Sequence, residues 1–388
     1  MSSREQVRNE ILAIPNNNIL LELPTSYGKT KIALELLDKK ATLQSKILIV
    51  IPRLTLIDTW KDELKKWKYW GKFTNNITFV TYVSFPKKAG VWDIVIFDEA
   101  HHLSQRCQDA LEDFIIHNSI LLSATVGRQR RKDFKYLFKN LYTYYVTIKE
   151  ATQEEVLPDP TVYLIPLELD NTKITCEIIK NKKQKIIMTV PFKDRWSVKD
   201  IKNRKIIIPC TQKQFYTDIS NLIAYYKNKM YIERYKNLYL QKCGERLKWL
   251  SNQKTALVKQ LLIKYDKERT LTFCNSILQT EELGTYCINS KNKISAEILD
   301  TFNNKKINHI TACDMLNEGV NLTDCRIGIY ATLNSSERMI KQKLGRLLRH
   351  PHPIIIIPYF KDTRDEEIVK KMCEDYNPDL IKIINYEY

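Results

Sequence analysis

The stretch that most constrains this chain spans residues 18–30 and reads Asn-Ile-Leu-Leu-Glu-Leu-Pro-Thr-Ser-Tyr-Gly-Lys-Thr. Its apolar run, Ile19 to Leu23, predicts a buried strand, and Pro24 to Gly28 predict a tight loop before a helix that begins at Lys29. Because such a loop points backbone N–H groups at an anion, the order strand, loop and helix predicts a phosphate cradle. Lys29 would reach the β- and γ-phosphates, and the Thr30 hydroxyl would hold Mg²⁺.

The loop departs from the usual G-x-x-x-x-G-K-[ST] pattern, because Leu23 stands where the first glycine is expected. Tyr27 is a second departure, since small residues are common at that position. Its bulk must point away from the phosphates, and it either packs against the protein or meets the base of a nucleotide. The loop residues predicted to contact the nucleotide are Pro24, Thr25, Ser26, Tyr27, Gly28, Lys29 and Thr30.

Strands and helices alternate through the first 146 residues. Strand-like runs are expected at 19–23, 47–51, 77–81, 94–98 and 120–123. This alternation predicts a parallel α/β sheet with its ligand site at the carboxyl ends of the strands. The fourth strand delivers Asp98 and Glu99 to that edge. Asp98 can hold Mg²⁺ through water while Glu99 deprotonates the attacking water, and phosphoryl transfer needs both tasks done close together.

The chain is 388 residues long, which favours two domains. The first is predicted at 1–150, and a boundary follows where Glu154-Glu155 leads into Pro158-Asp159-Pro160. Residues 151–254 are predicted to hold a connector, including a strand-like run at 162–169, and a basic accessory insertion. From 255 to 388 the α/β alternation resumes, which predicts a second domain of the same kind.

Positive charge is concentrated in the middle of the chain. Residues 171–250 contain 19 Lys or Arg and 6 Asp or Glu, so they carry most of the net charge of +17. Polyanion binding is one interpretation, and a solubilising surface is the other. A hairpin at 174–190 would present Lys182, Lys183 and Lys185 at or beside its tip as nucleic-acid contacts. Tyrosines recur at helical spacing from 225 to 239, and this spacing favours core packing over base stacking.

Composition excludes several classes of protein. No apolar run approaches the about 20 residues that a membrane-spanning helix needs, and the N-terminus lacks the apolar region of a secretory signal. The nine cysteines form no C-x-x-C pair, so we expect reduced thiols in a cytoplasmic protein and no zinc site. The lysine-rich, glycine-poor composition is typical of an AT-rich genome, such as that of a virus acting in a host cytoplasm.

Several stretches, taken in order, resemble the motifs of superfamily 2 helicases and translocases. The phosphate loop, the D-E-A-H sequence at 98–101 and Leu-Ser-Ala-Thr at 122–125 resemble motifs I, II and III. The run Met-Leu-Asn-Glu-Gly-Val-Asn-Leu at 315–322 resembles motif V, and residues 342–349 fit the motif VI pattern Q-x-x-G-R-x-x-R. The D-E-A-H, L-P-T-S and N-E-G-V-N sequences look closest to phage branch-migration helicases and restriction-enzyme helicase subunits.

The resemblance implies roles for individual residues. Catalysis would fall to Lys29, Glu99, Arg346 and Arg349, the two arginines acting as fingers on the γ-phosphate. Further nucleotide contacts would come from Gln6, which the family uses to read adenine, and from Gly319 and Asn321. Residues expected to couple the nucleotide to the nucleic acid are His101, Ser123, Thr125 and Gln342. Contacts to the nucleic acid itself would come from Arg53, Thr81 and Asn275.

The resemblance also implies two RecA-like parallel-sheet domains in tandem, with a basic, mainly helical insertion plus hairpin between them. The implied enzyme is an ATP- and Mg²⁺-dependent DNA helicase or translocase that unwinds or remodels branched or duplex DNA. An RNA helicase, a non-catalytic nucleic-acid clamp and the motor subunit of a nuclease complex are the alternatives. We expect neither membrane nor zinc binding.

Overall fold

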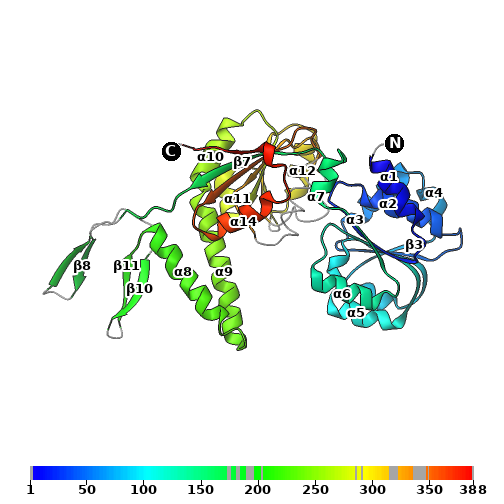
Figure 1. Ribbon diagram of the computed structural model, residues 1–388, viewed down its shortest axis with the longest axis horizontal. Helices are drawn as coiled ribbons and strands as arrows, with labels where there is room; N and C mark the ends of the chain where they lie inside the picture. Colours follow the sequence, from blue (N-terminus) through cyan, green and yellow to red (C-terminus); the bar gives the residue numbers. More distant parts are fainter. Residues whose placement is uncertain are drawn as a thin grey trace.

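The computed structural model contains two α/β domains, each built on a parallel sheet (Figure 1). It describes residues 3–172, 176–180, 184–188, 196–201, 204–284, 286–289, 292–313, 322–334, 347 and 349–386. For Ser3 and for the described residues between 176 and 209, only the backbone is considered. The tandem parallel-sheet architecture predicted from the sequence is confirmed.

The first domain is a six-stranded parallel sheet with strand order β3-β2-β4-β5-β1-β6. Its strands are β1 (Asn18–Glu22), β2 (Ile47–Ile51), β3 (Ile77–Thr81), β4 (Gly90–Phe97), β5 (Phe114–Ser123) and β6 (Tyr142–Tyr145). Its α-helices are α1 (Ser3–Ala13), α2 (Lys29–Lys40), α3 (Leu56–Lys66), α4 (Trp70–Phe73), α5 (Gln105–Ala110), α6 (Arg128–Leu137) and α7 (Ile148–Gln153). All five runs predicted as strands form strands of this sheet.

Both faces of the first sheet are covered, because successive strand residues point to opposite sides. In β2, Ile47 and Ile49 pack in one core cluster with residues of α1, α2 and α3. Leu48 and Val50 pack in another, with aromatic side chains that include Phe134 of α6. Figure 1 shows the sheet between these two sets of helices. A strand that is buried on both faces needs an uninterrupted apolar run, which explains the sequence Ile-Leu-Ile-Val-Ile of β2.

The second domain has a seven-stranded sheet with the order β13-β14-β12-β15-β16-β7-β17. Its strands are β7 (Thr161–Leu167), β12 (Thr270–Cys274), β13 (Cys287–Ile288), β14 (His309–Cys313), β15 (Ile327–Tyr330), β16 (Ile354–Phe360) and β17 (Ile381–Ile383). Its helices are α10 (Thr255–Lys264), α11 (Ile277–Leu283), α12 (Ser295–Asn303) and α14 (Arg364–Cys373).

One segment lies in a different place from the one predicted. The run 162–169 was expected in a connector, whereas β7 pairs with β16 and β17 inside the second sheet. Sequence order hides this pairing, because more than 180 residues separate Leu167 from its partner strand at Ile354. The alternating burial of β7, with Val162 and Leu164 on one face and Ile165 and Leu167 contributing to another cluster, stabilises the pairing.

The insertion projects from the second domain (Figure 1). It consists of two antiparallel hairpins and a pair of helices: β8 (Cys176–Lys180), β9 (Gln184–Met188), β10 (Trp196–Ile201), β11 (Arg204–Pro209), α8 (Gln212–Lys227) and α9 (Glu233–Gln253). The first hairpin was predicted, and the second was not. Among the described residues, no helix has the length and hydrophobicity needed to cross a membrane.

Candidate active site

The phosphate loop follows β1 and ends at the first residue of α2. Leu23 N donates to Ser123 O at 3.1 Å, and Tyr27 N donates to Pro24 O at 3.2 Å, so the loop turns tightly beside the end of β5. Gly28 has φ +99°, a conformation that L side chains rarely adopt, which explains the glycine at this position. The loop therefore aims the N-terminus of a 12-residue helix at the edge of the sheet.

Lys29 extends along the inside of this loop. Its Nζ donates to the carbonyl oxygens of Leu23 at 3.0 Å and Pro24 at 3.3 Å, which places the ammonium group in the cradle. Tyr27 is 1% exposed and belongs to a core cluster that includes residues of β1, α1 and α2, so its ring packs inside the protein. Burial and the nearby charge of Glu154 raise the pKa of Tyr27 to about 12, which keeps the phenol neutral.

Asp98 and Glu99 follow β4 at the same edge. The backbone of Asp98 is fixed by its N–H, which donates to Val50 O at 2.8 Å, and by its carbonyl, which accepts from the Tyr82 hydroxyl at 2.7 Å. Its Oδ2 accepts a hydrogen bond from Trp60 Nε1 at 2.9 Å. Glu99 has φ +48°, a left-handed conformation that is unfavourable for glutamate and is typical of functional turns.

The protein desolvates the Asp98 carboxylate, although part of the residue remains open to the pocket. Desolvation and the adjacent charge of Glu99 raise the pKa of Asp98 to about 6. The Trp60 hydrogen bond and the charge of Lys29 act in the opposite direction. Two crowded carboxylates in such surroundings favour a bound cation, and Mg²⁺ prefers oxygen ligands. Asp98 and Thr30 line the same cavity and supply such oxygens, so this site fits Mg²⁺.

Glu99 is connected to the loop after β5 through His101. His101 Nδ1 lies 3.4 Å from Glu99 Oε2 and 3.2 Å from Ser123 Oγ. Ser123 Oγ in turn donates to Thr125 O at 3.1 Å. Three of the residues predicted to couple nucleotide and nucleic acid therefore form one chain of contacts that starts at Glu99.

The phosphate loop, Trp60, Asp98 and Glu99 line a cavity of about 590 Å³ to which both domains contribute. From the second domain comes Arg349, whose Nε donates to Ser26 Oγ of the phosphate loop at 3.1 Å. Although Arg349 keeps an exposed surface, desolvation of its guanidinium lowers its pKa, while the charge of Glu63 acts in the opposite direction. Thr25 Oγ1 is buried with no hydrogen-bond partner among the described residues, as expected of a group that faces a ligand.

Gln6 does not line this cavity. It is exposed and donates to Glu10 Oε1 at 3.2 Å, whereas the cavity lining from α1 consists of Arg4, Glu5 and Arg8. Arg4 and Arg8 are four residues apart and share one face of the helix, so Gln6 lies on the opposite face. The predicted adenine-reading position is therefore not supported by this arrangement.

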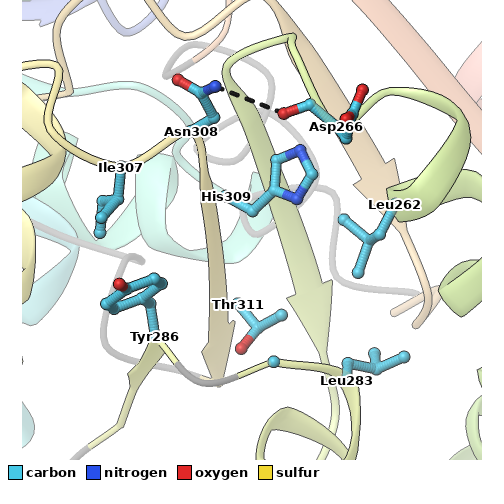
Figure 2. Close-up of a pocket in the computed structure, with 9 residues that line it drawn as sticks. Leu262, Asp266, Leu283, Tyr286, Ile307, Asn308, His309 and Thr311 are labelled. Carbon is cyan, nitrogen blue, oxygen red and sulfur yellow. Dashed lines mark hydrogen bonds between the residues drawn. The ribbon is translucent and has the colours of Figure 1, made fainter.

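A second cavity, of about 490 Å³, lies in the second domain beside β14 (Figure 2). Figure 2 shows Leu262, Leu283 and Thr311 around it, with Asn308 Nδ2 donating to Asp266 O at 3.3 Å. None of the predicted site residues that the structure describes lines this cavity. Residues 25–30 of the phosphate loop, which are predicted to bind the nucleotide, instead line the cavity to which both domains contribute.

Two family models match the chain, and each corresponds to one domain. Residues 4–128 match the res subunit of type III restriction enzymes, and residues 253–351 match the helicase conserved C-terminal domain. The first match contains the phosphate loop and D-E-A-H, and the second contains Arg349. The chain belongs to the superfamily 2 helicases. It is a nucleic-acid-dependent ATPase of the helicase and translocase class.

One relative is similar to this chain in sequence, and solved structures are similar to it in fold. The helicase is 24% identical over 378 residues to the DNA 3'-5' translocase XPB2 of Sulfurisphaera tokodaii, and the match covers 92% of this chain and 79% of that protein. The fold is similar to S. cerevisiae Dbp5 bound to RNA and ADP BeF3, with TM-score 0.61, 12% identity and 98% and 89% of the two chains covered. It is also similar to the Hef helicase domain of Pyrococcus furiosus, with TM-score 0.52, 12% identity and 95% and 97% covered.

Three of the predicted nucleic-acid contacts of the helicase lie at the carboxyl edges of the two sheets. Arg53 follows β2, Thr81 ends β3 and Asn275 follows β12. Their roles stay predictions. The other predicted residues Lys182, Lys183, Gly319, Asn321, Gln342 and Arg346 lie outside the described residues, as does the side chain of Lys185.

Sequence reasoning missed two residues of the helicase site. Trp60 was not among the predicted site residues, and its indole Nε1 donates to Asp98 Oδ2 at 2.9 Å. Glu22, the last residue of β1, is 1% exposed and accepts from Val126 N at 2.8 Å and from both Nε and Nη2 of Arg131. It joins the strand before the phosphate loop to the segment after β5. An acidic residue inside an otherwise apolar strand was the available signal for Glu22.

Proposed function

We propose that this helicase is a DNA translocase that uses ATP hydrolysis to unwind or remodel duplex or branched DNA. The observation that carries the proposal is the Arg349–Ser26 contact across the cavity at 3.1 Å. It brings a cation of the second domain to the loop that would hold ATP in the first. ATP bound in this cavity would therefore interact with both domains, so its hydrolysis would change their relative position.

Each residue of the cavity has a separate role in ATP hydrolysis. Lys29 binds the β- and γ-phosphates, and the N-terminus of α2 adds backbone donors and a favourable dipole. Asp98 and Thr30 would hold Mg²⁺, which neutralises charge on the phosphates when it is bound. Glu99 accepts a proton from the water whose oxygen attacks the γ-phosphorus. The bond to the β–γ bridging oxygen then breaks, and Arg349 stabilises the charge that develops.

One observation supports a nucleic-acid substrate, and a second favours DNA. Residues 171–250 carry an excess of 13 positive charges, from 19 basic and 6 acidic residues, which favours the binding of a polyanion. The relative from Sulfurisphaera tokodaii is described as a DNA translocase. Arg53, Thr81 and Asn275 would contact the nucleic-acid backbone. Arg53 and Thr81 lie at the carboxyl edge of the first sheet, where the phosphate loop and Asp98 also lie, and Asn275 lies at the carboxyl edge of the second sheet.

The test is ATP turnover by the full chain in the presence of single strands, duplexes, forks, four-way junctions and RNA of matched length. Duplex or branched DNA should stimulate turnover more than RNA does. Lys29→Ala is the control, and it should remove turnover with every substrate. Stronger stimulation by RNA would replace the proposal by an RNA helicase. Equal turnover with and without any nucleic acid would contradict both versions.

A further inference from the structure

The end of the α8–α9 pair carries a group of aromatic and basic side chains, which we name the tyrosine–lysine tip. It comprises Tyr225, Tyr226, Lys229, Tyr231 and Tyr235, from the end of α8, the connecting turn and the start of α9. Figure 1 shows this end of the two helices pointing away from the second domain. The prediction that these tyrosines pack in a core is wrong for Tyr225 and Tyr231, which are 48% and 83% exposed.

Three rings of the tip, those of Tyr225, Tyr226 and Tyr235, contact one another. The Tyr225 ring centroid lies 5.5 Å from that of Tyr226 and 6.3 Å from that of Tyr235, with interplanar angles of 65° and 84°. Lys229 Nζ lies 4.2 Å from the Tyr225 ring centroid and donates to the Tyr225 hydroxyl at 2.6 Å. Edge-to-face contacts of this kind hold aromatic rings in place without burying them. The tip is therefore an organised exposed aromatic surface.

The charged residues around the tyrosine–lysine tip indicate which kind of partner it binds. Residues 225–239 contain four basic side chains, Lys227, Lys229, Arg234 and Lys236, and one acidic side chain, Glu233. Apart from Lys229, which is half-buried, these charged residues are exposed. An apolar partner would gain nothing from these cations, whereas a nucleic-acid strand supplies phosphates for the cations and base faces for the rings.

The two helices that carry the tip are joined to each other and to the second domain. Arg246 Nη1 of α9 donates to Ser220 Oγ of α8 at 3.2 Å, which joins the two helices. At the other end of α9, Ser251 Oγ lies 2.7 Å from Gln279 Oε1 and 3.1 Å from Ala331 O, all buried inside the second domain. With 21 residues, α9 spans about 30 Å. Any movement of the second domain is therefore carried to the tip.

We propose that the tyrosine–lysine tip is a binding site for unpaired nucleobases of the nucleic-acid substrate, with Tyr225 and Tyr231 as the stacking rings. The inference rests on the proposed function, since it assigns part of the same substrate to a new surface. Because the tip is attached to the second domain, it moves relative to the nucleotide-binding domain when the cavity closes. A base stacked there is displaced with each such movement, so the tip separates strands or holds a separated strand.

The test uses the full chain and a single-stranded DNA oligonucleotide that contains 2-aminopurine, whose fluorescence reports stacking. Tyr225→Ala with Tyr231→Ala should weaken binding of this strand about tenfold for each ring removed, which corresponds to about 1.4 kcal/mol each. Tyr225→Phe with Tyr231→Phe keeps the rings and should bind like the parent. The matched control is Tyr136→Ala, because Tyr136 is 88% exposed on α6 of the first domain. Circular dichroism confirms that each variant is folded.

Three outcomes contradict the inference. One is unchanged single-strand binding by the double alanine variant, and another is an equal loss in the phenylalanine variant. The third is a change from dimer to monomer in the alanine variant with unchanged nucleic-acid binding, which would make the tip a protein interface. If no nucleic acid changed the ATP turnover of the parent protein, the proposed function itself would be contradicted. Failure of the tip inference and failure of the proposed function are therefore distinguishable.

Discussion

Replacing Trp60 by phenylalanine should raise the Mg²⁺ concentration needed for half-maximal ATP turnover. It should have a smaller effect on the turnover rate at saturating Mg²⁺. Trp60 is 2% exposed, and its indole N–H donates to Asp98 Oδ2 at 2.9 Å. Phenylalanine keeps most of the ring packing and removes only the donor. The Asp98 carboxylate then loses the group that orients it toward the cavity where Thr30 lies.

The size of the effect follows from the surroundings of Asp98. A hydrogen bond to a charged group contributes about 1.5–3 kcal/mol. Because Asp98 remains partly accessible from the cavity, water can replace the indole, and the lower end of this range applies. About 1.4 kcal/mol corresponds to a tenfold change, so the Mg²⁺ concentration for half-maximal ATP turnover should rise about tenfold.

The assay is nucleic-acid-stimulated ATP turnover titrated with Mg²⁺ at a constant ATP concentration. Trp92→Phe is the matched control, because the Trp92 indole donates to Lys88 O at 2.9 Å on the surface. It should leave the Mg²⁺ requirement unchanged. The reasoning fails if Trp60→Phe has the same Mg²⁺ requirement as the parent, or if it only lowers the rate at every Mg²⁺ concentration, as a purely structural residue would.

Three further substitutions test the site and the stability of the second domain. Glu99→Gln should keep ATP affinity, measured with a fluorescent analogue, while turnover falls at least about 100-fold, because the general base is lost. Arg349→Ala should lower turnover about 1,000-fold with little change in ATP affinity, and unchanged turnover would remove it from the reaction. Lys254→Ala should lower the free energy of unfolding by about 3–5 kcal/mol in a denaturant titration, since the Lys254–Asp365 ion pair of 2.6 Å is fully buried. Lys305→Ala breaks an exposed pair of equal length and should cost less than about 1 kcal/mol.

Much of the architecture could be read from local patterns. Strands that are buried on both faces must be uninterrupted apolar runs, so β2 was visible in the sequence before its partners were known. Polar residues directly after such strands lie at the carboxyl edge of a parallel sheet, which is why Asp98 and the phosphate loop were assigned to one site. The position of strand β7 could not be predicted in this way, because its residues indicate a strand but not the sheet that the strand joins.

The tyrosines of α8 and α9 show why burial could not be predicted from helical spacing. Helical spacing places Tyr225 and Tyr226 on a helix, but it does not show where the partner surface ends. Ile219 and Ile223 of α8 are buried, whereas Tyr231 lies beyond them in the connecting turn and is exposed. Periodicity predicts which residues share a face. Burial depends on what lies opposite that face, which the sequence does not state.

The sequence by itself determined which residues are candidates for binding and hydrolysing the nucleotide. Lys29, Thr30 and the pair Asp98–Glu99 are specified by residue type and by position after a strand, both of which are local properties. Only the tertiary structure decided that Tyr27 packs in the core, that Trp60 orients Asp98 and that Arg349 reaches Ser26. These contacts join residues that are far apart in the chain or that lie in different domains. They depend on the packing of whole elements, which no short stretch of sequence encodes.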